Sequence, residues 1–370
     1  MRFTEFSGEW KEELLDRIAT LSKGIGIPKE QLSEDGDPCI LYGELYTKYK
    51  SEIIKQVESK TDIDGSKLKR SKANDVIIPC SGETAVDIAT ARCVPFDSIL
   101  LGGDLNVISL HKYDGAFMSY QLNGKRKYDI ARVAQGVSVV HLYGEHLKTI
   151  KTYNPTLPEQ QKIAILLSLL DERIATQNKI IEDLKKLKSA ISHILFSSKG
   201  AIHLSEIANV VMGQSPSSNA YNDQGLGMPL VQGNLDISNG KTTPRLYTAE
   251  FNQMTEKGNI ILTVRAPVGE VAKATQKVCL GRGVCAIIPQ EENMSDFIYQ
   301  YLTFYKFMWR RYEQGSTFTS INGSDVRNIF CPKVRNVSIL TLLDIKINIE
   351  ERVVKQYQSQ KQYMLYQMFI

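Results

Sequence analysis

Cations beside glycine turns are the feature of this sequence that could do chemistry, and that chemistry would be the binding of nucleic acid. In residues 257–285, five cations stand against the single acid Glu270. Phosphates attract cations, and arginine side chains can form paired hydrogen bonds with base edges. Such clusters also occur as solubilising loops, but their recurrence in both halves of the chain favours DNA. The candidate DNA-binding cations are Lys67, Lys69, Arg70, Lys125, Arg126, Lys127, Arg265, Lys273, Lys277 and Arg282.

No catalytic pattern stands out in the sequence. Gly233 to Thr242 resembles a phosphate-binding loop, but six residues separate its glycines where the motif has four. Asn239-Gly240 is more typical of a hairpin turn. The five histidines have no metal-ligand spacing, and the six cysteines form no C-x-x-C pair. We therefore predict a non-catalytic chain without a metal site; a self-contained enzyme, such as a single-chain nuclease, is an alternative.

A long amphipathic helix is the clearest structural signal in the chain. Pro158 and Glu159 suit a first helical turn, since proline needs no hydrogen bond there and an acid complements the helix dipole. Apolar residues then recur at alternating spacings of four and three, between mostly charged residues. Such a narrow seam is typical of a helix that packs against one partner helix. The seam residues are Ile163, Leu167, Leu170, Ile174, Gln177, Ile181, Leu184, Lys188 and Ile191.

A second helix near the end of the sequence repeats this seam 173 residues later. Its seam residues are Leu343, Ile347, Glu350, Val354, Tyr357 and Lys361. In an antiparallel pair of these helices, Lys188 would face Glu350. Gln177 would face Lys361 in the same way, and buried polar pairs of this kind often fix helix register. The alternative is that these are unrelated polar positions on the surface.

The two helices belong to a larger internal repeat. Residues 15–24 match 204–213, residues 41–45 match 231–235, and residues 169–171 match 342–344. Gln135-Gly136 likewise matches Gln314-Gly315. Because the matches keep the same order while their offset drifts, we infer two homologous halves.

Each half is predicted to open with a short amphipathic helix, to continue as β-rich sequence and to close with a long helix. The candidate strands are 75–78, 98–101, 138–142, 259–264 and 284–288. This predicts an α+β fold: two homologous mixed α/β domains joined by two long antiparallel coiled-coil helices, with pseudo-two-fold symmetry. The predicted boundaries are 1–155 for the first domain, 156–198 for its helix, 199–333 for the second domain and 334–370 for the second helix.

Composition agrees with a globular protein. Of 370 residues, 42% are hydrophobic and 23% charged, which argues against disordered and fibrous chains. The net charge of +4 is compatible with nucleic-acid binding without being diagnostic. No stretch is apolar enough to span a membrane, and the first residues lack the apolar core of a signal peptide. We therefore expect a cytoplasmic protein.

The sequence resembles the DNA-specificity (S) subunit of type I restriction-modification systems. Residues 154–163 (Asn-Pro-Thr-Leu-Pro-Glu-Gln-Gln-Lys-Ile), followed by Leu169-Leu170-Asp171, are similar to the start of that family's conserved spacer helix. Residues 135–136 and 314–317 resemble the family's turn before the helix. Residues 213–216 and 265–269 resemble elements of its target-recognition domains. The second half departs from the family by having Cys331-Pro332-Lys333-Val334-Arg335 at its helix start.

This resemblance implies a DNA-binding specificity subunit with two target-recognition domains, each reading one half of a bipartite target. It adds Gln214 and Ser215 to the candidate DNA-binding residues. The implied partners are double-stranded DNA, methyltransferase subunits, expected to be two, and restriction or translocase subunits. S-adenosylmethionine, ATP and Mg would belong to those partner subunits, with no cofactor in this chain. The alternative is a coiled-coil scaffold without specific DNA readout.

Overall fold

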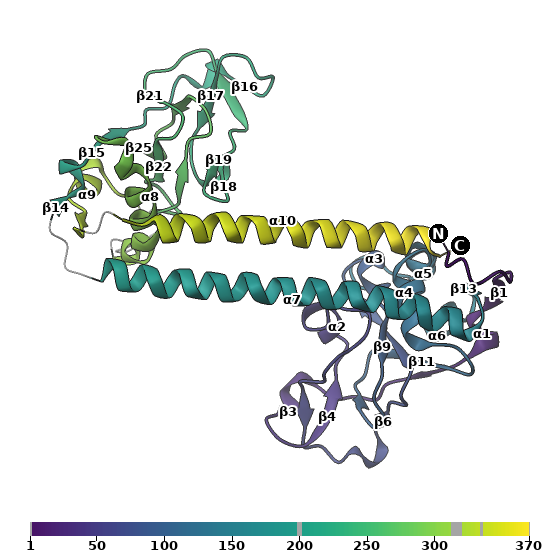
Figure 1. Cartoon of the computed structure of the whole chain (residues 1–370). Coiled ribbons are helices and arrows are strands. Elements are labelled where there is room, and N and C mark those ends of the chain that lie inside the picture. The colour runs from purple at the N-terminus through teal and green to yellow at the C-terminus, as the bar shows by residue number, and fades with distance from the viewer. Residues whose placement is uncertain (1, 198–201, 312–319, 334–335, 370) are drawn as a thin grey trace. The chain divides into compact units, whose positions relative to one another are not determined.

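The computed structural model describes residues 2–197, 202–311, 320–333 and 336–369. The chain forms two compact units (Figure 1). Unit 1 comprises Met1–Lys179 with Arg352–Ile370, and unit 2 comprises Ile180–Glu351. Each long helix therefore contributes one segment to each unit. The predicted turn at residues 314–317 and residues 334–335 of the second helix start lie outside the described residues.

In the described residues, unit 1 contains a four-stranded sheet, a five-stranded sheet and two sheets of only two strands each. The four-stranded sheet is antiparallel in the order β2 (Ala19–Lys23), β11 (Leu105–Leu110), β7 (Asp75–Pro79) and β9 (Arg92–Val94). The five-stranded sheet has the order β3 (Leu32–Ser33), β5 (Lys60–Thr61), β4 (Asp37–Ile40), β10 (Leu100–Leu101) and β6 (Lys69–Arg70). The apolar side chains of Val76, Ile77 and Ile78 are fully buried, so strand β7 packs on both of its faces.

Unit 2 repeats this plan. Its larger sheet begins β15 (Ala208–Met212), β25 (Val284–Pro289), β22 (Ile260–Thr263) and β23 (Val271–Lys273), and continues through β19 (Lys241–Thr242) to β18 (Ile237–Ser238). Its smaller sheet has the order β16 (Tyr221–Asn222), β20 (Leu246–Thr248), β17 (Met228–Val231), β24 (Val278–Leu280) and β21 (Met254–Thr255). The parallel pair β4–β10 of unit 1 recurs as β17–β24.

One helix follows the main sheet in each unit at the same point of the repeat. These are α4 (Gly115–Asn123) after β11 and α8 (Ser295–Tyr305) after β25. With the shared strand order, this equivalence confirms two homologous halves and the predicted α+β fold. The predicted strands at 75–78, 259–264 and 284–288 correspond to β7, β22 and β25. Strands β7 and β25 each end one residue later than predicted, and β22 is one residue shorter at each end.

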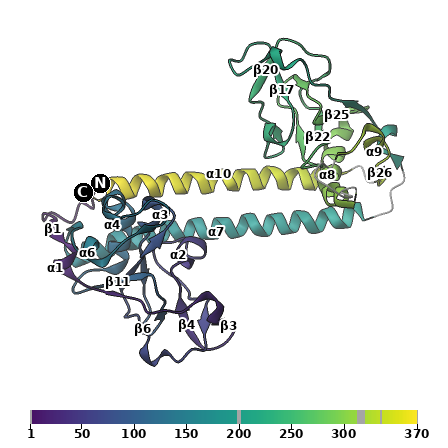
Figure 2. The ribbon, with the colours of Figure 1, turned by 180° about the vertical axis from the view of Figure 1, so that it is seen from behind.

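The long helices are α7 (Leu157–Phe196) and α10 (Ser338–Gln367). In unit 1, the first part of α7 packs with the last part of α10, and Ile163, Leu167 and Met364 share one apolar cluster. In unit 2, Leu195 from the end of α7 packs against a cluster that contains Leu340 from the start of α10. The helix segments are therefore antiparallel within each unit, and views from both sides agree (Figures 1 and 2).

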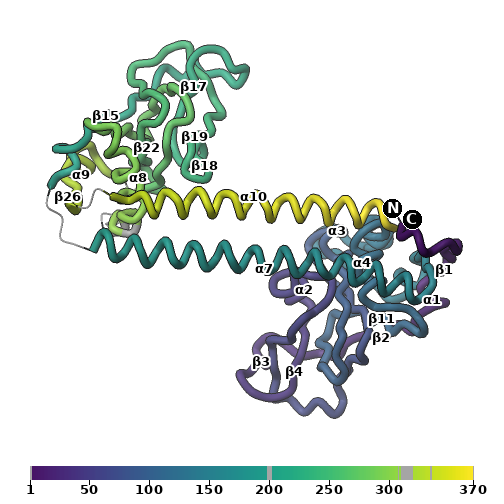
Figure 3. Tube along the Cα trace, in the orientation of Figure 1, coloured from purple at the N-terminus to yellow at the C-terminus, as the bar shows by residue number. Residues whose placement is uncertain are grey.

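The start of α7 is fixed by charge. Glu159 is buried and forms an ion pair with Arg2, whose Nε lies 2.7 Å from Oε1. Trp10 donates to the same carboxylate at 3.3 Å. The first residues of the chain thus lie beside this helix, and Figure 3 draws them next to the end of α10 in the same unit. Phe3 packs against the apolar cluster that includes Phe369, which follows α10.

The prediction that a short amphipathic helix opens each half is wrong about the length of that helix. In unit 1 it is one turn, α1 (Leu15–Ile18), between β1 (Lys11–Leu14) and β2. In unit 2 it is a 3-10 turn, η3 (Leu204–Glu206). The flanking residues pair with other strands, and an isolated turn is too short to compete with that pairing. Among the described residues, no helix is both long and apolar enough to cross a membrane.

Candidate nucleic-acid interface

A groove in unit 2 brings together three of the predicted DNA-binding residues. It has a volume of about 670 Å³, and Ser215, Arg265 and Arg282 line it. Ser215 follows β15, Arg265 follows β22, and Arg282 lies in the turn between β24 and β25. Gln214 precedes Ser215, and its backbone N–H donates to the carbonyl of Leu280 at 2.9 Å. The fold thus collects at one place residues that are far apart in sequence.

Glycines allow the backbone to close up around this groove. A Cβ atom on Gly213 would lie 2.1 Å from the carbonyl oxygen of Gly281. A Cβ atom on Gly283 would lie 2.1 Å from the carbonyl oxygen of Gln232. Between these contacts, the backbone N–H of Arg282 donates to Ser215 Oγ at 3.1 Å. The Arg282 turn is therefore held firmly by neighbouring backbone.

Arg245 also lines this groove, and sequence reasoning missed it. Its Nε lies 3.0 Å from Asp236 Oδ1, and the Asp236 side chain is only 4% exposed. Asp236 Oδ2 also accepts the backbone N–H of Gln232 at 2.8 Å. The sequence contains a feature that could have identified it, because Arg245 comes shortly after the Asn239-Gly240 turn and other candidate cations also lie close to glycine turns.

Two predicted cations of the second half lie outside this groove. Lys273 forms an ion pair with Asp296 at 2.5 Å and lies over the ring of Tyr299. Lys277 forms an ion pair with Glu256 at 2.6 Å. Since both have acidic partners within the protein, the groove arginines are the stronger candidates for DNA contact.

The first-half candidates fall into two separate groups. Lys67, Lys69 and Arg70 lie on η2 (Gly65–Lys67) and the edge strand β6. Arg70 is paired with Asp37 at 2.7 Å and also donates to the carbonyl of Ser98 at 3.0 Å. Lys67 and Lys69 lie at the edge of the five-stranded sheet of unit 1, which corresponds to the five-stranded sheet that borders the groove in unit 2.

The second group lies at the turn between α4 and α5 (Lys127–Val133). The Nζ of Lys125 is 4.4 Å from the ring centroid of Tyr366 on α10. Arg126 is 14% exposed and pairs with Asp129 at 3.3 Å. These contacts give Lys125 and Arg126 structural partners beside the helix, away from η2 and β6. For Lys127, DNA contact stays a prediction.

Unit 1 has a groove at the place equivalent to that of unit 2. Two adjoining hollows, of about 730 and 780 Å³, share Tyr42, Gly43 and Thr47. The β-ladder registers make Gly103 equivalent to Arg282 and Ser81 equivalent to Arg265. Further lining residues of unit 1 are Lys29, Tyr46, Glu83, Asp87 and Ser138. The two grooves therefore share a backbone plan but present different side chains.

The seam residues of both long helices are buried or half-buried. This holds for each predicted seam residue: Ile163, Leu167, Leu170, Ile174, Gln177, Ile181, Leu184, Lys188 and Ile191 of α7, and Leu343, Ile347, Glu350, Val354, Tyr357 and Lys361 of α10. Residues between them are mostly exposed, as expected of a narrow seam.

The two seam lysines have acidic partners other than the residues predicted to face them. In unit 1, Lys361 Nζ lies 2.5 Å from both Asp171 Oδ1 and Glu52 Oε2. In unit 2, Lys188 Nζ lies 2.5 Å from Asp344 Oδ1. Each acid lies six residues before the expected partner, next to the seam, because a lysine stem is long enough to reach a flanking carboxylate. Asp171 and Asp344 are themselves repeat equivalents.

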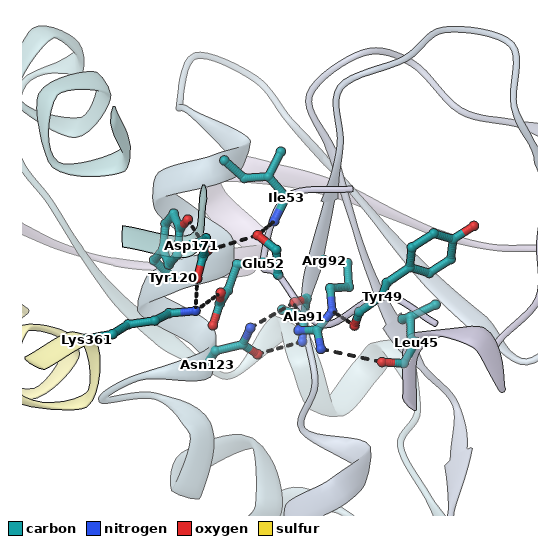
Figure 4. A network of polar contacts seen from close by, with 11 residues as sticks. Leu45, Tyr49, Glu52, Ile53, Ala91, Arg92, Tyr120, Asn123, Asp171 and Lys361 are labelled. Atoms are coloured by element: carbon teal, nitrogen blue, oxygen red, sulfur yellow. Dashed lines mark hydrogen bonds and ion pairs between the residues drawn. The ribbon is translucent and has the colours of Figure 1, made fainter. Parts of the chain in front are cut away.

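Each of these ion pairs also holds the helix that follows the main sheet, and Figure 4 shows the unit 1 network. Tyr120 of α4 donates to Asp171 at 2.7 Å. The equivalent residue of α8, Gln300, donates to Asp344 at 2.7 Å. Burial and the neighbouring Asp171 carboxylate raise the pKa of Tyr120, so its hydroxyl remains a donor. The duplicated acid thus joins α7 or α10 to its own α/β domain.

A buried arginine lies beside this network in unit 1. Arg92 donates to the backbone carbonyls of Tyr49, Ala91 and Leu45 (Figure 4). Burial lowers the pKa of Arg92, and the nearby carboxylate of Glu52 opposes that shift. Its donors are directed at main-chain oxygens, so we assign it a structural role.

The cysteines are buried thiols. All six are free, and burial raises the pKa of Cys39 and Cys80 to about 11 and that of Cys93, Cys285 and Cys331 to about 12. In the ranges that the structure describes, no three His, Cys, Asp or Glu side chains are grouped so that they could hold a metal ion.

Comparison with known proteins gives matches along almost the whole chain. The family model described as the type I restriction modification DNA specificity domain matches twice, over residues 8–186 and 200–356. A putative type I restriction enzyme specificity subunit, MjaX, from Methanocaldococcus jannaschii is 34% identical over 208 residues. That match covers 50% of this chain and 49% of the relative, so it spans about half of the relative's length.

Solved structures share the fold. The S subunit of a type I restriction-modification system from M. genitalium aligns over 100% of this chain and 99% of its own, with a TM-score of 0.65 and 21% identity. A chain from a structure of the assembly and conformational transition of the type I R-M system aligns over 98% and 97%, with a TM-score of 0.61 and 19% identity.

Proposed function

The chain belongs to the type I restriction-modification DNA specificity family, and from this premise we propose that it recognises a bipartite DNA target and directs methyltransferase and restriction subunits to it. The duplicated groove is the observation that carries this proposal. Equivalent backbone in the two units presents a different set of side chains in each groove. A protein that reads two different half-sites needs this combination, since base readout depends on side chains while docking depends on a constant frame.

The chain acts without catalytic chemistry of its own in this proposal. Methyl transfer and cleavage belong to partner subunits, which would bind S-adenosylmethionine, ATP and Mg. The specificity chain supplies the grip on the duplex that lets a methyltransferase extrude its target base.

Exposed apolar residues on the long helices support partner binding. In unit 2, Ile180, Leu187 and Ile194 of α7 are 40%, 48% and 78% exposed. Their seven-residue spacing places them on one face of the helix. Exposed apolar stripes on a helix are typical of surfaces that another protein covers.

The test is a methylation assay with the cognate methyltransferase subunits and a domain exchange. Residues 199–333 are replaced by the same region of a relative with a different target. We expect one half-site of the methylated sequence to change and the other to stay the same. If both half-sites stayed unchanged, the assignment of a reading domain to unit 2 would be wrong.

A salt titration separates this function from that of a coiled-coil scaffold. A chain that contacts several phosphates releases counterions, so its DNA affinity should fall steeply as salt rises. A scaffold with incidental basic loops would bind DNA weakly and show no steep dependence. Fluorescence anisotropy with a labelled duplex measures this slope directly.

A further inference from the structure

We propose that Arg265 and Arg282 read guanine in the half-site recognised by unit 2. This inference rests on the proposed function, because it concerns the chemistry of the same groove. Unit 1 has Ser81 and Gly103 at the two equivalent positions. The contacts proposed here therefore belong to the half-site of unit 2 alone.

The two arginines are placed together by the backbone. The N–H of Val264 donates to the carbonyl of Gly283 at 2.9 Å. Arg265 directly follows the first residue of this hydrogen bond, and Arg282 directly precedes the second. Both side chains line one groove. This places two guanidinium groups on one surface.

Their charge is available for DNA. Asp236 is the acid that lines the groove, and it is buried and paired with Arg245. In the part of the chain that the structure describes, neither Arg265 nor Arg282 has an ion pair. By contrast, Lys273 and Lys277 of the same unit are paired with Asp296 and Glu256.

The rigidity of the turn favours a contact in which Arg282 forms two parallel hydrogen bonds. The Arg282 backbone is bound to Ser215 Oγ, and Gly283 packs against Gln232 too closely to admit a Cβ atom. A guanidinium that starts from a fixed backbone loses less entropy when it forms two parallel hydrogen bonds. In the major groove, guanine offers two adjacent acceptors, O6 and N7, which match this fork.

The experiment is selection from a randomised duplex library by the full chain at fixed salt, followed by sequencing of the bound DNA. The variants are Arg265→Ala, Arg282→Ala and their glutamine counterparts, and Lys273→Ala is the control. We expect the wild-type chain to select guanine at one or more positions of one half-site. Each arginine variant should lose about 10- to 100-fold preference at one of these positions, and the other half-site should remain unchanged. Glutamine should favour adenine at the relaxed position, because it pairs with adenine N6 and N7.

The outcomes separate this inference from the function on which it rests. A half-site without guanine, or a loss of affinity that is uniform over all sequences in both arginine variants, would overturn the inference while leaving DNA recognition intact. A wild-type chain that selects no sequence at all would overturn the proposed function. Retained selection at the other positions of the unit 2 half-site reports in the same experiment that the domain carrying the variant is folded.

Discussion

At the scale of single residues, Lys361 ties α10 to the rest of unit 1 through two ion pairs. It neutralises two carboxylates, Asp171 and Glu52, whose side chains are 7% and 8% exposed. Replacing Lys361 with methionine would keep much of the apolar stem but leave both acids buried without a cation. Breaking a buried pair by removing one partner costs roughly 3–5 kcal/mol. We expect Lys361→Met to lower the urea midpoint of unit 1 strongly, as followed by hydrogen exchange of the amides of α4.

A matched control comes from an exposed lysine of the other long helix. Lys186 pairs with Glu182 on the surface of α7, and both side chains are largely exposed. Lys186→Met should leave the midpoint unchanged, because exposed pairs contribute little. Equal loss of stability in the two variants would show that the Lys361 network contributes no more than a surface pair.

Gly213 gives a second prediction at this scale. A methyl group there would lie 2.1 Å from one backbone carbonyl oxygen and 2.7 Å from another, and Gly24 is equally crowded at the equivalent point of unit 1. To relieve these close contacts, the backbone segments on either side of the groove would have to move apart. We expect Gly213→Ala to destabilise unit 2 by about 1–3 kcal/mol and to weaken selection of its half-site. Gly8→Ala is the control, since nothing lies within 4 Å of its added carbon. A fully stable Gly213→Ala protein would contradict the close packing.

At the scale of elements, local patterns were predictable and long-range contacts were not. Helix α7 begins at Leu157, one residue after the predicted boundary at 156, because both the apolar seam and the proline of the first turn are local features of this helix. The predicted opening helix is only one turn long in unit 1, because its neighbours pair with β11 and β13 (Lys151–Asn154), which lie far away in sequence. The lysine partners could not be read from the seam alone, since Asp171 is oriented by Tyr120 from another helix.

The same reasoning explains what the sequence revealed of the groove. Glycine turns with cations identified Arg265 and Arg282 as candidates, but no local feature indicates that they share one surface with Ser215. That meeting depends on the parallel pairing of β17 with β24. For the same reason, no local pattern favours these arginines over Lys273 and Lys277, whose acidic partners come from separate elements.

At the scale of the whole molecule, binding to DNA and binding to partner subunits should be separable, because the residues responsible are different. The double variant Leu187→Glu, Ile194→Glu places charge on the exposed apolar face of α7 in unit 2 and leaves the buried seam intact. A desolvated charge in an otherwise apolar interface is costly, so we expect association with the methyltransferase subunits to weaken at least tenfold. Affinity of the isolated chain for its DNA target should stay within about twofold, since neither residue lines the groove. Analytical ultracentrifugation measures the association with the methyltransferase subunits, and fluorescence anisotropy measures the affinity for DNA.

Glu182→Gln, an exposed polar change on the same helix, is the control. If the double variant assembled as well as the wild type, the partner would bind elsewhere; if it lost DNA affinity as well, the two functions would not be separable.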